Sequence, residues 1–322
     1  MVECEAFMIS IIIPCRNEAR YIRQVLDALR DQDFTDFETI IVDGDSDDET
    51  VSIVQQYSAQ QPLHLKLIHN PQRTIPSSLN LGIENASGEI IVRLDAHSRP
   101  AKNYLSACLN ALDESGAEVV GGAWDVKAGD DTIVAAAIAA AVSSPLGAGD
   151  AAYRLNQNQA RDADTVPFGC FRRGTWESVG GYNEELFANE DYEFYFRLRQ
   201  RGGRIYFDPK IRCEYYAAST LRALAQQYWR YGWWKAQMLR RHPRSIRARQ
   251  LIPIAWSVLS LLALIIPALW IVWGIYLTVV LIESIRQARE ARHILPLACA
   301  YVIIHFAWGW GAWAGWMKRM TR

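Results

Sequence analysis

Two long uncharged stretches near the C-terminus restrict the folds open to this chain more than any other feature. Residues 251–282 form a run of 32 without a charged side chain, and residues 294–317 form a run of 24 in which His305 is the one group that titrates near neutral pH. A helix needs about 20 apolar residues to cross the hydrocarbon core of a bilayer. The second run fits one membrane span, whereas the first is too long for one straight span.

Pro267 lies near the middle of the first run. It could kink one tilted helix or mark the turn between two short spans, so the sequence leaves two or three spans open. Ten of the twelve tryptophans lie from Trp229 onward, which is typical of aromatic belts at the two membrane surfaces. We therefore expect residues 251–322 to form a transmembrane region rather than a buried hairpin of a soluble protein.

The charge distribution indicates which side of the membrane the rest of the chain occupies. Residues 218–250 contain eight Lys or Arg and no Asp or Glu. A basic, aromatic-rich segment that leads into an apolar run is typical of an amphipathic helix at a cytosolic membrane surface. Its direct join to a membrane span argues against nucleic acid as a partner. The six scattered cysteines favour reduced thiols over a disulfide framework or a zinc site.

The N-terminal residues read as a strand and not as a signal peptide. Residues 8–14 are apolar, but the run is too short and has no basic lead-in. A short, continuous apolar run is typical of a buried parallel strand. We expect residues 1–217 to fold as a catalytic domain in the cytosol, attached to the cell's inner (plasma) membrane by a multi-pass anchor.

Strand-like and helix-like patterns alternate along this first part of the chain. The strand-like runs are 9–13, 39–42, 65–68, 89–94 and 118–120, and stretches with helical spacing such as 18–30 and 49–57 separate them. This order predicts an α/β fold with a mostly parallel sheet and right-handed crossovers. Ligands of such sheets bind beyond the carboxyl ends of the strands, so the residues there are the candidates for function.

The first two strands are each followed by polar residues. Pro14-Cys-Arg-Asn-Glu18 follows the first, where Glu18 could hydrogen-bond a base or a ribose. Asp43 follows the second, where its carboxylate could accept a hydrogen bond from the N–H of a uracil or guanine ring. The alternative for Asn17 and for residues 46–50 is capping of the next helices.

The fourth strand-like run ends in Asp95 and His97, within Arg93-Leu-Asp-Ala-His-Ser98. An acid, a small residue and an imidazole at a strand end can present two ligands to a divalent cation and a diphosphate. An Asp-x-His turn can also be a capped loop, so the metal interpretation depends on the surrounding segments.

Taken in order, these segments resemble the family 2 glycosyltransferases of the GT-A fold. The matching segments are Pro14-Cys-Arg-Asn-Glu18, residues 42–50, Ser78-Leu-Asn-Leu-Gly-Ile83, Ala86-Ser-Gly-Glu89, Leu94-Asp-Ala-His97, Gly180-Gly-Tyr-Asn-Glu184 and Asn189-Glu-Asp191. The resemblance covers about residues 8–235. It is strongest to membrane-attached bacterial exopolysaccharide transferases of the succinoglycan glucosyltransferase type.

The resemblance implies roles for the residues at the strand ends. An inverting transferase needs a donor clamp, a cation to take the charge of the leaving diphosphate, and a general base. Glu18 and Asp43 would hold the nucleoside, with Pro14 and Arg16 beside it.

The metal ligands would be Asp95 and His97, and Asp95 would contact the ribose or a metal-bound water. His97 departs from the usual Asp-x-Asp pattern of the family. Imidazole suits Mn²⁺ better than Mg²⁺, so we expect Mn²⁺ (or Mg²⁺) as the cofactor.

On the acceptor side, the resemblance makes Asp191 the general base and has Glu190 orient the acceptor or assist. Residues 189–199 read as a helix whose first turn carries the acids, so interaction with the helix dipole is the alternative role. The stretch 227–231 resembles the Gln-x-x-Arg-Trp motif of processive polysaccharide synthases, with Tyr in the place of Trp. Gln227 and Arg230 would bind the donor diphosphate, or the helix would anchor at lipid headgroups.

These observations predict three segments, namely a catalytic domain over residues 1–217, a basic interfacial region over 218–250 and a transmembrane region over 251–322. The predicted activity is transfer of a hexose from a nucleotide-diphosphate sugar, with a UDP-sugar favoured, to a membrane-lipid or lipid-linked saccharide acceptor. A processive polysaccharide synthase and a catalytically silent nucleotide-binding scaffold are the two alternatives.

Overall fold

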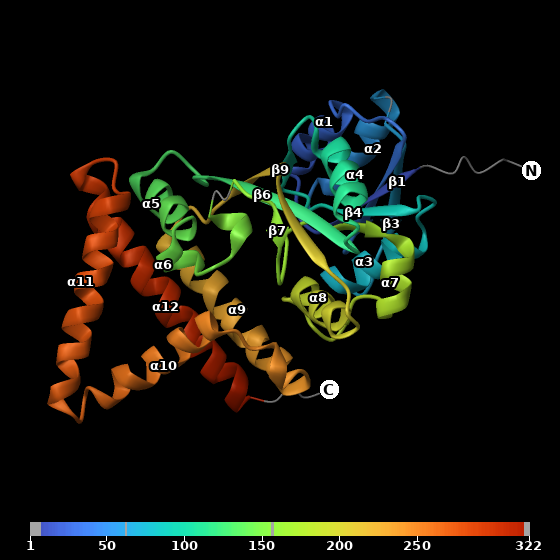
Figure 1. Ribbon diagram of the computed structural model, residues 1–322. Coiled ribbons are helices and arrows are strands. Elements are labelled where there is room, and N and C mark those ends of the chain that lie inside the picture. Colours follow the sequence, from blue (N-terminus) through green and yellow to red (C-terminus); the bar gives the residue numbers. More distant parts are fainter. Residues whose placement is uncertain (1–7, 62, 156–157, 319–322) are drawn as a thin grey trace, which may run out of the picture. The chain divides into compact units, whose positions relative to one another are not determined.

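The computed structural model describes residues 8–61, 63–155 and 158–318, which fall into two compact units (Figure 1). Unit 1 consists of Met1–Asp125 and Asn156–Tyr215, and unit 2 of Val126–Leu155 and Tyr216–Arg322. The chain therefore passes from one unit to the other three times. The segment Val126–Leu155 clusters with the C-terminal helices, although the sequence analysis grouped it with residues 1–217.

Unit 1 is built on one mixed sheet, which has nine strands in the described part of the chain. The strand order is β3-β2-β1-β4-β8-β6-β9-β5, and β7 pairs with β9 off this path. The strands are β1 (Ile9–Cys15), β2 (Phe37–Asp43), β3 (Leu65–His69), β4 (Ile90–Arg93), β5 (Arg99–Pro100), β6 (Val119–Lys127), β7 (Arg161–Asp162), β8 (Cys170–Arg172) and β9 (Ile205–Tyr216).

The first four strands form the predicted parallel half of the sheet. β1 pairs in parallel with β2 and β4, and β2 pairs in parallel with β3. All seven residues of β1 are buried, as expected of a parallel strand covered on both faces. β8 runs antiparallel to both β4 and β6, so β6 points in the same direction as β4. The carboxyl ends of β1, β2 and β4 therefore open on one edge of the sheet.

The helices of unit 1 bury apolar stripes against this sheet. They are α1 (Ile22–Arg30), α2 (Thr50–Gln60), α3 (Ile75–Glu84), α4 (Tyr104–Ser115), α7 (Arg173–Val179) and α8 (Glu190–Gln200). Figure 1 shows α1 and α2 on one side of the parallel strands and α3 on the other. α3 packs directly on β1 and β2, because a Cβ at Gly82 would come within 2.5 Å of the Ile12 side chain.

Unit 2 is helical. Its α-helices are α5 (Ile133–Val142), α6 (Pro145–Ala148), α9 (Leu221–Arg241), α10 (Ala248–Leu262), α11 (Trp270–Gln287) and α12 (Ile294–Met317). In the described chain, 3₁₀ turns at Pro243–Ser245, Pro267–Leu269 and Ala291–His293 join α9 to α12, and a fourth at Ala152–Arg154 follows α6. The first uncharged run is thus two helices, α10 and α11, with a break before Pro267.

Two helical segments among the described residues are long and apolar enough to cross a membrane. They are Pro267–Gln287, with a mean hydropathy of 2.0, and Ala291–Met317, with a mean hydropathy of 1.5. α10 is apolar but shorter, and Pro253 interrupts its hydrogen bonding. Large apolar side chains such as Ile271, Ile275 and Leu295 are exposed on the two long segments, as expected of surfaces that face lipid.

α12 is the centre of unit 2. It runs beside α9 in Figure 1, and small residues make the close approach possible. A Cβ at Gly311 or Gly315 would overlap the backbone of α9, at Trp229 and Trp233. The two glycines therefore allow α9 and α12 to pack closely.

The segment between β6 and β7 also packs on α12. The hydroxyls of Ser144 and Tyr301 are 2.8 Å apart, and His305 hydrogen-bonds the carbonyl of Leu146 through Nε2 at 2.9 Å. The other ring nitrogen of His305 lies 3.0 Å from the hydroxyl of Tyr276 on α11. His305 thus joins three segments of unit 2 by hydrogen bonds.

Candidate active site

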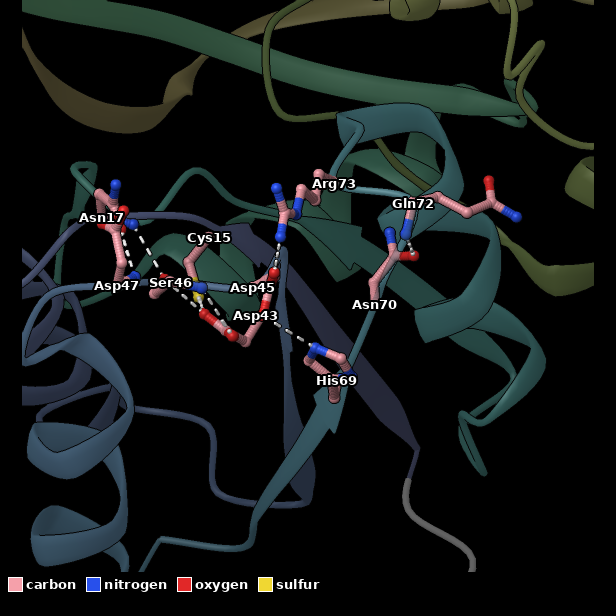
Figure 2. A network of polar contacts seen from close by, with 10 residues as sticks. All are labelled: Cys15, Asn17, Asp43, Asp45, Ser46, Asp47, His69, Asn70, Gln72 and Arg73. Atoms are coloured by element: carbon pink, nitrogen blue, oxygen red, sulfur yellow. Dashed lines mark hydrogen bonds and ion pairs between the residues drawn. The ribbon is translucent and has the colours of Figure 1, made fainter.

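The loops after β1 and β2 are joined to each other and form one wall of the site. The backbone N–H of Asn17 donates to Ser46 Oγ at 2.9 Å, and the backbone N–H of Asp47 donates to Asn17 Oδ1 at 2.9 Å. The backbone N–H of Glu18 donates to Thr50 Oγ1 at 2.8 Å. These polar side chains therefore fix the loops relative to each other (Figure 2).

Asn17 does not cap α1, whereas residues 46–50 do lead into α2, and the Asp48 carboxylate accepts from the backbone N–H of Thr50 at 2.9 Å. α1 begins at Ile22 with Tyr21 as its N-cap, and α2 has Glu49 as its N-cap without a side-chain bond. Asn17 has a φ of 58°, in the left-handed region that asparagine tolerates better than most residues. Its side chain bonds the neighbouring loop because the chain turns sharply before the helix starts.

Asp43 lies at the end of β2 and is 5% exposed. Its carboxylate accepts from the backbone N–H of Ser46 at 3.1 Å and from Ser46 Oγ at 2.5 Å. Burial and the nearby carboxylate of Asp43 raise the pKa of the Cys15 thiol, which keeps it neutral. Each carboxylate oxygen has a second lone pair, so Asp43 keeps the capacity to accept from a ligand.

Pro14 and Arg16 flank the same strand end. Pro14 is buried within β1 opposite Val42, whereas Arg16 is exposed just beyond the strand. Proline fits here because the paired register of β1 and β4 ends at Ile12, so the ladder needs no backbone N–H at position 14.

A group that the sequence analysis did not identify lies at the end of β3. His69 Nε2 is 3.4 Å from Asp45, and the guanidinium of Arg73 also pairs with Asp45. Asp45 and Arg73 have φ values of 61° and 60°. Buried Asn70 holds the start of α3 through Ser77 Oγ at 2.8 Å. Figure 2 shows these side chains beside Asp43, so they belong to the wall formed by the β1 and β2 loops.

His97 and Glu18 meet across the carboxyl ends of β4 and β1. His97 Nδ1 is 3.0 Å from Glu18 Oε1. This hydrogen bond, together with the charge of Asp95, raises the pKa of His97. The contact orients the imidazole with Nδ1 towards Glu18, and the backbone carbonyl of Asp95 accepts from Ser98 to close the turn. Glu18 therefore contacts the predicted metal ligand, whereas the sequence analysis had placed it on the nucleoside.

Arg93, the last residue of β4, joins the two halves of the site. Its Nη2 lies 2.9 Å from Glu190 Oε1 and 3.3 Å from Asp95 Oδ1, and its Nη1 lies 3.9 Å from Asp191 Oδ2. The Arg93 side chain is 8% exposed. Burial alone would lower its pKa, but the three carboxylates hold the pKa well above the ordinary value. The structure thus brings Asp95, Glu190 and Asp191 together, as predicted, around an arginine that was not predicted.

Glu190 and Asp191 open α8, as the acidic first turn of the predicted helix requires. The Glu190 side chain is 6% exposed and that of Asp191 is 32% exposed. Burial raises the pKa of Glu190 to about 7 and also raises the pKa of Asp191. Asp191 is thus the more accessible of two carboxylates with increased proton affinity, which suits a general base.

Asn80 explains why two distant segments lie together beside this cluster. Its side-chain amide donates to the carbonyl of Tyr182 and to Glu184, both at 2.9 Å. Its Oδ1 accepts from the backbone N–H of Tyr182 at 2.8 Å and from the indole of Trp176 at 3.2 Å. One asparagine on α3 therefore fixes the turn that precedes α8.

Asp95 and His97, the predicted metal ligands, would need donor phosphates and water to complete the shell of a cation. Among residues 8–61, 63–155 and 158–318, no group of three or more His, Cys, Asp or Glu side chains could hold a metal ion alone. Divalent cations at phosphate-binding sites commonly take one or two protein ligands and complete their shell with phosphate and water. The Glu18 contact suits this role for His97, because metal-binding histidines commonly bond a carboxylate through their other nitrogen.

Gln227 and Arg230 lie on α9 of unit 2. Arg230 is exposed and Gln227 is half-buried. Their binding to the donor diphosphate stays a prediction.

Comparison with known sequences finds one matching family model and several similar proteins. A sequence model described as "Glycosyl transferase family 2" matches residues 10–174. The chain is 29% identical over 311 residues to the succinoglycan biosynthesis protein ExoA of Rhizobium meliloti, over 94% of this chain and 93% of that protein. It is 26% identical over 305 residues to the dolichyl N-acetyl-alpha-D-glucosaminyl phosphate 3-beta-D-2,3-diacetamido-2,3-dideoxy-beta-D-glucuronosyltransferase of Methanococcus voltae, over 92% of this chain and 93% of that enzyme.

Comparison with solved structures covers a similar share of the chain. The mannosyltransferase PcManGT from Pyrobaculum calidifontis, in complex with GDP-Man and Mn²⁺, superposes with a TM-score of 0.64 at 20% identity, over 93% of this chain and 87% of that one. S. aureus TarS (residues 1–349) in complex with UDP superposes with a TM-score of 0.50 at 20% identity, over 73% of this chain and 71% of that one. The likeness to PcManGT extends into the residues of unit 2.

Proposed function

Because this chain belongs to glycosyl transferase family 2 and has the predicted GT-A fold, we propose that it is an inverting hexosyltransferase that uses a nucleotide-diphosphate sugar. The chain is a glycosyltransferase, so the silent scaffold is set aside. One observation carries the finer proposal. The acid predicted for the donor side, Asp95, and the acid predicted for the acceptor side, Asp191, contact the same guanidinium.

On the donor side, Asp43 and Pro14 would receive the nucleoside, with Arg16 at the exposed end of the strand. Asp43 is held rigidly by Ser46, so a base N–H would meet a fixed acceptor. We favour a UDP-sugar as the donor.

Asp95 and His97 would hold Mn²⁺, or Mg²⁺, against the donor diphosphate. When bound, the cation neutralises charge that develops on the leaving diphosphate. Glu18 keeps the His97 ring oriented through Nδ1. Arg230 and Gln227 would add contacts to the same diphosphate.

Asp191 would accept the proton of the acceptor hydroxyl as that oxygen attacks the sugar. Its raised pKa brings its proton affinity closer to that needed near neutral pH. Glu190, more buried and paired with Arg93, would orient the acceptor from beside it.

We propose a membrane lipid or lipid-linked saccharide as the acceptor. The name of the Methanococcus voltae relative includes a dolichyl phosphate, and another relative, from Campylobacter jejuni, is named for an undecaprenol-linked substrate. The two candidate spans and the basic residues of 218–250 would hold the enzyme at the cytosolic face of the inner membrane, near such an acceptor.

A donor screen tests this function. Membranes that contain the protein are incubated with Mn²⁺ and a panel of labelled nucleotide sugars, and the labelled lipid or glycan is identified by mass spectrometry. We expect one donor to label a lipid with inverted anomeric configuration. Asp191→Asn should lower this rate by about 10²–10⁴-fold, the usual contribution of a general base.

The same assay supplies a control variant and the outcomes that would contradict the proposed function. Asp113→Asn changes an exposed acid outside the site and should keep the wild-type rate. A wild-type protein that consumes no donor would contradict the proposal. A product that grows by many sugars from one acceptor would instead identify a processive synthase.

A further inference from the structure

Arg93 faces three carboxylates, yet the proposed chemistry gives it no role. Its Nη2 is shared between Glu190 at 2.9 Å and Asp95 at 3.3 Å, and its Nη1 points towards Asp191 at 3.9 Å. Within the described chain, Nε and Nη1 have no hydrogen-bond partner. The Arg93 guanidinium therefore faces three carboxylates for which roles in donor or acceptor binding are predicted.

The position of Arg93 makes it a rigid reference point. β4 lies between β1 and β8 in the sheet, and the backbone N–H of Arg93 donates to the carbonyl of Gly169 at 3.1 Å. All four residues of β4 are buried. The side chain therefore projects from the middle of the sheet and not from a loop, so its base has little freedom to move.

The groups that Arg93 joins come from two separate segments. Asp95 lies in the turn after β4, whereas Glu190 and Asp191 open α8, after the chain has passed through unit 2 and returned. Glu190 makes the shortest of the three contacts and is slightly more buried than Arg93 itself. Glu190 is therefore the anchor of the guanidinium, and this anchoring leaves Nη1 on the side of Asp191.

We propose that Arg93 is a positioning residue that sets Asp95 and Asp191 relative to each other for the transfer reaction. This inference rests on the proposed function, because it concerns the roles proposed for Asp95 and Asp191. It assigns no substrate contact to Arg93. A planar guanidinium has five N–H donors in fixed directions and can serve three carboxylates at once. An ammonium group is a single compact charge and cannot reproduce that geometry.

A simpler role for Arg93 is neutralisation of buried Glu190. Removal of one partner of a buried pair leaves the other charge uncompensated, whereas replacement of both partners by neutral groups is often tolerated. The two roles therefore differ in the double variant Arg93→Gln/Glu190→Gln. If Arg93 only neutralises Glu190, the kcat of the double variant should match that of Glu190→Gln alone. If Arg93 positions the site, the kcat of the double variant should be lower still.

The experiment measures thermal unfolding, kcat and donor KM for Arg93→Lys, Arg93→Gln, Glu190→Gln and the double variant, in purified full-length protein. We expect Arg93→Gln to lower both the unfolding temperature and kcat. The double variant should regain the unfolding temperature of Glu190→Gln but keep a kcat about tenfold or more below it. Arg93→Lys should lower kcat by about tenfold or more while donor KM changes by less than about threefold.

Arg204→Gln is the matched control, because Arg204 pairs with Asp162 on the surface with 49% of its side chain exposed. It should change neither kcat nor the unfolding temperature. A wild-type kcat in Arg93→Lys, or a double variant equal to Glu190→Gln, would overturn the positioning role while wild-type turnover persists. Absence of turnover in the wild-type protein contradicts the proposed function itself, so the two failures are distinct.

Discussion

At the scale of single residues, the site depends on side chains that hold other side chains. Glu18 orients His97, Ser46 fixes Asp43, and Glu190 anchors Arg93. Groups held in this way need little rearrangement when the charge of a reaction develops, which is the basis of electrostatic preorganisation. Substitutions at the supporting residues are therefore expected to change rates more than they change donor binding.

We expect His97 to determine the metal preference of the enzyme. We expect wild-type turnover to be faster with Mn²⁺ than with Mg²⁺, because Mg²⁺ strongly prefers oxygen ligands. His97→Asp should narrow this difference by supplying a carboxylate. The metal preference is measured as the ratio of kcat/KM with saturating Mn²⁺ to kcat/KM with saturating Mg²⁺. His64→Asp, the same change at an exposed position before β3, should leave the ratio as it is.

We expect the unfolding temperature to change with pH as the Glu190 carboxyl group ionises. Burial raises its pKa from 4.5 to about 7, so the folded state binds this proton more tightly than the unfolded chain does. The stabilising contribution is therefore fully present below about pH 4.5 and is lost as the pH rises to about 7. Glu190→Gln should have an unfolding temperature that falls less than that of the wild type across this window. Equal slopes for the two proteins would contradict the assignment.

At the scale of elements, close backbone approach decides which glycines the sheet and helices require. Gly82 lets α3 lie on β1 and β2, and a Cβ at Gly88 would come within 2.7 Å of the backbone nitrogen of Ser10. Both glycines fall in the segments Ser78–Ile83 and Ala86–Glu89 that carry the family resemblance. These two glycines of the family segments therefore allow the close packing that brings the strand ends together.

Gly82→Ala is expected to lower the free energy of unfolding by about 1–3 kcal/mol, the usual cost of overpacking a core. Gly174→Ala in α7 is the matched control, because no atom lies within 4 Å of the added Cβ. That change should be neutral or stabilise the protein by up to about 1 kcal/mol, since alanine is the better helix former. Unfolding temperatures of the two variants make the comparison, and a Gly82→Ala protein as stable as wild type would contradict the packing argument.

At the scale of the whole molecule, the sequence patterns predicted elements of both units, but no pattern marked Val126–Leu155 as part of unit 2. Alternating strand and helix patterns predicted the parallel strands, and uncharged runs predicted the apolar helices. The placement of Val126–Leu155 was missed because α5 is a short alanine-rich helix, which has the composition of any core helix. Arg93 was missed because its partners Glu190 and Asp191 are distant in sequence, and no local pattern records such a contact.

A chain that ends at Tyr216 tests this division. Without α9 to α12, the buried face of α5, which includes Ile138, would be exposed to water. We expect this fragment to aggregate, and Ile138→Gln to increase its soluble fraction. In the full chain the same substitution should lower the unfolding temperature, because Ile138 is fully buried there. Ile40→Gln, in the core of unit 1, should lower stability in both proteins.

The packing of α5 on α12 also has a consequence for the order of events during synthesis. α5 ends at Val142, and its partner α12 begins at Ile294. At about 5–20 residues per second, the ribosome needs on the order of ten seconds to make the intervening chain. Throughout that interval the nascent α5 has an apolar face without its partner helix. We therefore expect the growing chain to need the bilayer or a chaperone to shelter α5 until α12 is made.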